Sequence, residues 1–172
     1  MFSITSTIEI DAAHRVPTHG SKCFNLHGHR YKIQATAVAD ELGSGEETAM
    51  VMDFSFLKKA MMDVIDCACD HGTIVWHKDH LLCYMLNGHT ATSIVEMQKK
   101  VASNGSCLSM GSVHSGHMKV LMVDFIPTAE LLAKFWFQEL QDVVNDLHGG
   151  RVTLKHLEVW ETPNNKATYP AE

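Results

Sequence analysis

The chain has 172 residues, with 14 Lys and Arg against 20 Asp and Glu, so its formal net charge is −6. This length fits one domain and can bury a core without disulfide or metal staples. A hydrophobic content of 45% argues against disorder. The acidic balance argues against nucleic-acid binding, and no apolar run reaches the roughly 20 residues that span a bilayer.

Five Cys and twelve His are the unusual counts in this composition. An odd number of Cys does not suit a secreted disulfide framework. The opening Met1-Phe2-Ser3-Ile4-Thr5 has neither the basic nor the apolar region of a secretory signal. We therefore expect a cytoplasmic protein with reduced thiols. His is the commonest metal ligand, so the spacing of the His residues matters most.

Two strands are expected at the start of the chain. From Phe2 to His14 apolar and polar residues alternate, which indicates a half-buried strand with His14 on its apolar side. After a turn-rich loop over 16–24, a second strand begins near His27 and places His27 and His29 on its apolar side. If the strands pair in an antiparallel way, the three imidazoles meet on one face.

The middle of the chain is expected to hold a helix and a long insertion. Asp53 is a good N-cap for a helix that ends near Gly72, where glycine can close it. Residues 73–119 contain scattered His and a Ser/Gly-rich stretch, with a possible helix around 91–101. We interpret them as an insertion within a single domain over residues 1–172.

The last third of the chain is expected to add a short strand, a long helix and two final strands. The strand covers 120–125, and the helix begins after Thr128 as N-cap and ends at Gly149-Gly150. A strand over 151–161 and a segment through Tyr169 follow. The order β-β-α-(insert)-α-β-β suggests an α+β fold, with two helices on one face of an antiparallel sheet.

Three His from two adjacent strands form a candidate zinc site. Catalytic Zn²⁺ typically takes three protein ligands and leaves a fourth position open. The candidates are His14, His27 and His29. Ordinary core or surface His is the alternative. His114-x-x-His117 lies in a loop without a partner strand, and the two thiols of Cys67-x-Cys69 do not share a helix face, so these are weaker candidates.

Several other residues suggest acid–base chemistry. Cys23 precedes His27 by four residues, and a nearby cation would favour its thiolate, although an inert loop Cys fits as well. Asp70-His71 is a candidate acid–base pair, but adjacent residues need not face each other. Glu161 falls on the apolar side of its strand, where a carboxylate needs a cationic or multi-donor partner. Glu130 suits the first turn of a helix.

Six segments occur in the order of one known family. They are Ala12-Ala13-His14-Arg15, Cys23-Phe24-Asn25-Leu26-His27-Gly28-His29, Val51-Met52-Asp53-Phe54, Cys69-Asp70-His71, Pro127-Thr128-Ala129-Glu130 and Val159-Trp160-Glu161-Thr162. In these segments the chain resembles the 6-pyruvoyltetrahydropterin synthase / 6-carboxytetrahydropterin synthase family. The resemblance runs over about residues 2–170, with 73–119 as a lengthened stretch.

The resemblance implies a tunnelling fold of ββααββ subunits, whose sheets join around a central β-barrel. It implies a homohexamer or another even homo-oligomer with active sites between subunits. By position, the implied zinc ligands are His14, His27 and His29, the implied catalytic residues are Cys23, Asp70 and His71, and the implied substrate-binding residues are Glu161, Thr128 and Glu130.

The implied activity is that of a lyase acting on dihydroneopterin triphosphate. The compact spacing of Cys23 and His27 resembles the 6-carboxytetrahydropterin synthases of 7-deazaguanine (queuosine) biosynthesis, which release acetaldehyde and triphosphate. The alternative is a 6-pyruvoyltetrahydropterin synthase, which eliminates triphosphate and rearranges the side chain. A non-catalytic pterin-binding member and a structural zinc protein are further alternatives.

Overall fold

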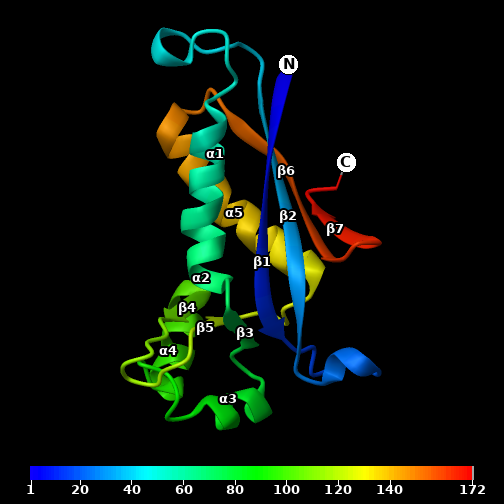
Figure 1. Ribbon diagram of the computed structural model, residues 1–172, viewed down its shortest axis with the longest axis vertical. Coiled ribbons are helices and arrows are strands. Elements are labelled where there is room, and N and C mark those ends of the chain that lie inside the picture. Colours follow the sequence, from blue (N-terminus) through cyan, green and yellow to red (C-terminus); the bar gives the residue numbers. More distant parts are fainter. Residues whose placement is uncertain (172) are drawn as a thin grey trace. The chain divides into compact units, whose positions relative to one another are not determined.

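A computed structural model describes residues 1–171 (Figure 1). Its strands are β1 (Phe2–His14), β2 (His27–Ala39), β3 (Gly72–Trp76), β4 (Ser106–Ser109), β5 (Val120–Val123), β6 (Thr153–Thr162) and β7 (Asn165–Tyr169). Its main helices are α1 (Phe54–Met61), α2 (Cys67–Cys69), α3 (His80–Leu86), α4 (Ile94–Asn104) and α5 (Ala129–His148). A helix able to cross a membrane does not occur within residues 1–171.

The strands form one sheet with the hydrogen-bonded order β4-β5-β3-β1-β2-β6-β7. The chain divides into two compact units, and each is described by itself. The first unit comprises residues 1–9, 31–67 and those from 132 onward, and the second comprises residues 10–30 and 68–131.

The long strands β1 and β2 follow the predicted alternation. The bounds of β1 are those predicted, and its residues from Ser6 onward alternate between buried and more exposed positions. Side-chain hydrogen bonds join Thr5 to Thr36 and Asp11 to Arg30. Residue numbers therefore rise along β1 while those of the partners on β2 fall by the same amount. This register confirms the expected antiparallel pairing of the two strands.

The first unit is built as the sequence predicts, apart from one helix. β2 pairs with β6 and β6 with β7, both antiparallel. Asp53 caps α1 by accepting a hydrogen bond from the Ser55 amide at 2.7 Å. Trp136 of α5 is fully buried and packs edge to face on Tyr31 of β2. Between α1 and α2 the helix widens to a π-helical segment, η3 (Met62–Asp66), which the sequence pattern does not indicate.

The second unit corrects the prediction of an antiparallel sheet. β3 pairs in parallel with both β1 and β5, and only β4 runs antiparallel to β5. The lengthened stretch is therefore an ordered layer. Helices α3 and α4 bury their apolar sides against these strands in a core of Val75, Leu82, Cys83, Leu86, Ile94, Met97, Val101, Cys107, Val120 and Met122.

The turn between α2 and β3 also differs from the prediction. His71, and not Gly72, adopts the left-handed conformation, with a φ of 53°. That conformation costs a residue with a side chain about 1 kcal/mol or more. Gly72 is required for another reason, because a Cβ atom there would lie 3.1 Å from both the Cys69 carbonyl oxygen and Cδ of Lys119. The glycine therefore permits a close crossing.

Candidate active site

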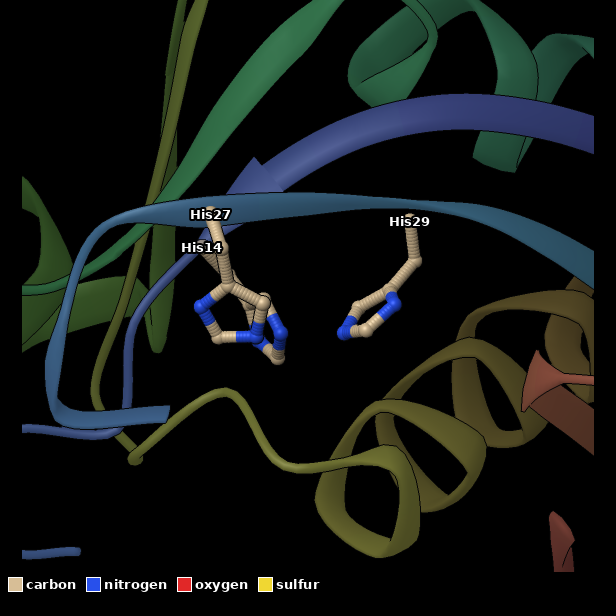
Figure 2. Close-up of side chains that lie close together, drawn as sticks. All are labelled: His14, His27 and His29. Atoms are coloured by element: carbon tan, nitrogen blue, oxygen red, sulfur yellow. The ribbon is translucent and has the colours of Figure 1, made fainter. Parts of the chain in front are cut away.

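Three imidazoles gather where β1 ends and β2 begins (Figure 2). His14 comes from β1, His27 and His29 come from β2, and all three point to the same side of the two strands. The ring centroids are 4.6 to 5.2 Å apart. One potential ligand atom of each ring lies within 4.8 Å of the other two, so the three residues could hold a metal ion.

Main-chain carbonyls orient two of these rings. Nδ1 of His14 donates to the carbonyl oxygen of Pro127 at 2.6 Å, and Nδ1 of His27 donates to that of Asn25 at 2.8 Å. A His that donates from Nδ1 carries its lone pair on Nε2, which is the form that binds metals. Nε2 of His27 is buried and makes no hydrogen bond among the described residues. The donor set therefore suits Zn²⁺.

Burial lowers the pKa of two rings of the cluster. Loss of hydration outweighs the hydrogen bond to Pro127 and, together with the charges of His27 and His29, lowers the pKa of His14 to about 4. Burial and the neighbouring His27 likewise lower the pKa of His29. Because metal binding requires neutral imidazoles, the lowered pKa values of His14 and His29 favour the form that binds an ion.

Cys23 lies in the loop that joins the two His-bearing strands. It occupies a short 3-10 turn over Lys22–Phe24 and is half-buried. Its carbonyl accepts a hydrogen bond of 2.8 Å from the amide of Val16, two residues after His14. One hydrogen bond thus holds the loop at Val16, and the bond from Nδ1 of His27 to the Asn25 carbonyl holds its other end. Both bonds restrain the loop that carries the Cys23 thiol.

The structure brings Asp70 and His71 together as a dyad. Nδ1 of His71 donates to Oδ2 of Asp70 at 2.7 Å. The other carboxylate oxygen accepts from the Asp11 amide at 2.9 Å, and the amide of His71 donates to the Asp11 carbonyl at 2.7 Å. The left-handed turn at His71 lets these two adjacent side chains face each other, which the sequence alone left open.

Hydrogen bonds keep Asp70 ionised. Burial works to raise the pKa of Asp70, but the Asp11 amide, the bond with His71 and the positive charges of His71 and Lys119 outweigh it and lower that pKa. The imidazole of His71 is largely exposed, with 78% of its side-chain surface accessible. An ionised carboxylate beside an exposed imidazole can orient it for proton transfer.

A cavity of about 930 Å³ opens beside the dyad in the second unit. His71 lines it together with Asp11, Arg30 and Lys119, and His29 also borders it. The side chains of Asp11 and Arg30 form an ion pair at 2.7 Å. By strand alternation these side chains lie on the face of β1 and β2 opposite to the three imidazoles. The cavity beside His71 is therefore lined in part by side chains from the face of β1 and β2 that is opposite to the three imidazoles.

The remaining predicted residues are placed as follows. Thr128 is half-buried at the start of α5, and its Oγ1 accepts from the Leu131 amide at 3.4 Å, which confirms it as N-cap. The preceding residue, Pro127, is the one that orients His14. Glu130 is exposed in the first turn of α5. Glu161 belongs to the first unit, where it is half-buried at an irregular position of β6.

The weaker metal candidates are not brought together. Among residues 1–171, only the three-His cluster offers three ligand atoms to one ion. His114 is exposed, and Nδ1 of His117 is occupied by the Ser115 hydroxyl at 2.9 Å. Cys69 is buried, whereas Cys67 is exposed.

A buried ion pair next to the cluster is a feature that sequence reasoning missed. Nε of Arg15 lies 3.0 Å from Oδ2 of Asp79, and both side chains are almost fully buried. Asp79 also caps α3. The guanidinium of Arg15 lies 4.7 Å from the centre of the Phe24 ring, beside Cys23. In the sequence, the only sign that Arg15 belongs to this region was its position directly after the candidate ligand His14.

Comparison with solved structures defines the class of fold. An uncharacterized protein of Wolinella succinogenes aligns with a TM-score of 0.73 at 21% identity and covers 99% of this chain and 98% of its own. The 6-pyruvoyl tetrahydropterin synthase of Caenorhabditis elegans aligns with a TM-score of 0.55 at 20% identity, covering 99% and 96%. The chain thus has the α+β tunnelling fold.

Sequence comparison places the chain within that class. The sequence model of the family described as 6-pyruvoyl tetrahydropterin synthase matches residues 3–172. The 6-carboxy-5,6,7,8-tetrahydropterin synthase of Haemophilus influenzae is 31% identical over 98% of this chain and 99% of its own length. That of Aquifex aeolicus is 29% identical over 99% of both. The chain belongs to the 6-pyruvoyl tetrahydropterin synthase family.

Proposed function

We propose that this protein is a zinc-dependent 6-carboxy-5,6,7,8-tetrahydropterin synthase. It would convert 7,8-dihydroneopterin triphosphate and water to 6-carboxytetrahydropterin, acetaldehyde and triphosphate, a step of 7-deazaguanine (queuosine) biosynthesis. The observation that carries the proposal is the convergent three-His cluster, in a chain that aligns over nearly its whole length with synthases of this name. We expect the protein to be cytoplasmic.

His14, His27 and His29 would hold the zinc ion. When bound, Zn²⁺ acts as a Lewis acid that makes protons on the neighbouring carbon atoms of the substrate side chain more acidic. The residues fit this role because their metal-binding nitrogens converge and because two of the rings are already oriented by the carbonyls of Pro127 and Asn25.

Two groups of the chain would move protons. Cys23, as thiolate, removes a carbon-bound proton, since its loop joins the two His-bearing strands. His71, oriented by the carboxylate of Asp70, moves a second proton from the opposite side. Glu161 would bind the N–C–N edge of the pterin through a bidentate, charge-assisted contact. Thr128 and Glu130, at the start of α5, would also contact the substrate.

The active site would form between copies of the chain. This is supported by the cavity beside His71, whose Asp11 and Arg30 side chains lie on the face of β1 and β2 opposite to the three imidazoles. A second copy that presents its His71 to the cluster would complete the set of proton-transfer groups. We propose a homohexamer or another even homo-oligomer, in which sheets join into a barrel. Size-exclusion chromatography with light scattering measures the assembly, and a monomer with full activity would contradict it.

Product analysis tests the reaction. The zinc-loaded protein is incubated with dihydroneopterin triphosphate, and acetaldehyde, triphosphate and the pterin product are measured. We expect acetaldehyde and 6-carboxytetrahydropterin in equal amounts, and their loss in Cys23→Ala. A 6-pyruvoyl product without acetaldehyde would contradict the proposal and identify a 6-pyruvoyltetrahydropterin synthase.

Two simpler controls separate catalysis from binding. If the chain only bound pterins, Cys23→Ala would change nothing that can be measured, whereas Glu161→Gln would still weaken ligand binding. If zinc were purely structural, a chelator would unfold the chain. A catalytic ion should instead be removable with loss of activity and little change in circular dichroism.

A further inference from the structure

Lys119 reaches the dyad from the far end of the lengthened stretch. Its Nζ donates a hydrogen bond of 2.7 Å to the main-chain carbonyl of Asp70, a residue 49 positions earlier. Its aliphatic stem crosses directly over Gly72, where Cδ and Cγ lie 3.1 and 3.3 Å from the place of a Cβ atom. The half-buried side chain therefore packs closely against Gly72, where any Cβ atom would be tightly confined.

The backbone of the dyad is thus held from two sides. On one side, the amide and the carbonyl of Asp11 bond to the Asp70 carboxylate and the His71 amide. On the other side, Lys119 holds the Asp70 carbonyl. Because His71 sits in the left-handed region, its conformation persists only where neighbours enforce it. The amide of Thr73 also bonds to the Lys119 carbonyl at 3.1 Å, which fixes the base of the lysine.

The lysine also brings positive charge to the dyad. Lys119 lines the cavity that His71 lines. The charged and titratable groups that line this cavity with His71 are Asp11 of β1, His29 and Arg30 of β2, and His117 and Lys119 of the segment before β5. Asp11 and Arg30 neutralise each other in their ion pair. Lys119 therefore places a cation on the Asp70 carbonyl, directly beside the residue that carries the exposed imidazole.

We infer that Lys119 is a positioning residue for proton transfer, which holds the Asp70 carbonyl so that the imidazole of His71 is directed into the cavity. This inference rests on the proposed function. It gives the lengthened stretch a role, because the segment before β5 then forms part of the catalytic cavity. Lys119 itself need not touch the substrate.

The test uses three variants of the full-length, zinc-loaded protein. Lys119→Met removes the donor and the charge, Lys119→Gln keeps a donor without the charge, and Lys119→Arg keeps both. For Lys119→Met we expect kcat to fall about 10-fold with KM changed less than about 2-fold, since general acid–base groups contribute about 100-fold or more when well placed. Lys119→Arg should retain at least half of the wild-type kcat, and Lys119→Gln should lie between.

The pH profile separates positioning from simple folding. Loss of a cation favours the protonated imidazole, so the limb of the kcat profile due to His71 should move to higher pH in Lys119→Met and Lys119→Gln, and stay in Lys119→Arg. Lys100→Met is the matched control, because Lys100 pairs with Glu96 on the surface of α4. It should change neither kcat nor the profile.

Nuclear magnetic resonance titration of the His71 ring, assigned with His71→Asn, tests the inference without turnover. The pH at the midpoint of the His71 titration should be higher in Lys119→Met than in the wild type. A folded Lys119→Met with wild-type kcat, profile and midpoint would overturn the inference, and so would a loss of kcat that Lys119→Arg does not restore. The wild type could also lack turnover while the titration midpoint of His71 is still higher in Lys119→Met. That result would contradict the proposed function but would support the coupling of Lys119 to the dyad.

Discussion

The His cluster and the dyad of the second unit hold their imidazoles in opposite ways. In the cluster, neutral main-chain carbonyls orient His14 and His27, and burial lowers the pKa of His14 to about 4. In the dyad, a carboxylate orients His71, whose ring is largely exposed. The first arrangement prepares lone pairs for a cation, and the second prepares an imidazole to gain and lose protons. One residue type thus serves two chemical roles through its surroundings.

Removal of one imidazole of the cluster should have the largest effect. We expect His29→Ala to lose its stoichiometric zinc and to lower turnover more than about 100-fold, because changes in residues that only support metal ligands already cost 10–100-fold. Zinc content is measured by mass spectrometry together with activity. His80→Ala, at the exposed start of α3, is the control. A variant with full zinc occupancy would show that His29 is not a ligand.

The buried ion pair beside the cluster should matter for stability. Arg15→Met leaves the carboxylate of Asp79 buried without its partner, which should lower the free energy of unfolding by about 3 kcal/mol. Urea denaturation measures it. The double variant Arg15→Met/Asp79→Asn should recover more than half of the loss, because Asn keeps the cap of α3 without the charge. No recovery would mean that packing, and not charge, holds this strand end.

Exchange of the orienting carboxylate should disturb the dyad alone. Asp70→Asn replaces one of the two accepting carboxylate oxygens with an NH2 donor, so either Nδ1–H of His71 or the Asp11 amide loses its acceptor. We expect turnover to fall about 100-fold with zinc content unchanged. Asp63→Asn, at an exposed position, is the control. A parallel loss of zinc would contradict the separation of the two sites.

The same variant has a pH signature in stability. The pKa of Asp70 is lowered in the folded chain, so its carboxylate stabilises the fold above the ordinary pKa of 3.8. That contribution is lost as the pH falls through the lowered pKa. The difference in melting temperature between the wild type and Asp70→Asn should therefore be present at neutral pH and close below pH 3.8. A difference in melting temperature that persists below pH 3.8 would mean that packing, and not the charge of Asp70, causes it.

The N-cap of α1, in the first unit, provides a control for the effect of lower stability alone. Asp53→Ala removes the bond to the Ser55 amide and should cost about 1 kcal/mol of stability. Zinc content and the kcat profile should remain those of the wild type. If turnover fell as in Asp70→Asn, general destabilisation would explain the effects assigned above to the dyad.

The sequence predicted the parts of the site that depend on local periodicity. Alternation along β1 and β2 placed His14, His27 and His29 on one face, and the structure confirms that they meet. Capping preferences located the starts of α1 and α5 at Asp53 and Thr128. These features depend on neighbours only a few positions apart, which a single sequence displays.

The lengthened stretch was not predictable for identifiable reasons. β3 is buried on both sides, so its residues show no alternation that would separate it from a helix. Helix α3 exposes Leu81, Tyr84 and Met85, which obscures its amphipathic pattern. The contact of Lys119 with Asp70 joins residues far apart in the chain, and no local signal announces it. The same holds for the pairing of Arg15 with Asp79.

The separate core beneath α3 and α4 has a consequence for how such a protein can diverge. Insertions, deletions and substitutions can accumulate in a part that packs largely on itself while the strands that carry the imidazoles keep their register. Because residues of that part also line the cavity, substitutions there can change which ligands fit the cavity while the three imidazoles and the dyad stay the same. Gly72 marks the boundary of this freedom, since a side chain there would press against the lysine that crosses it.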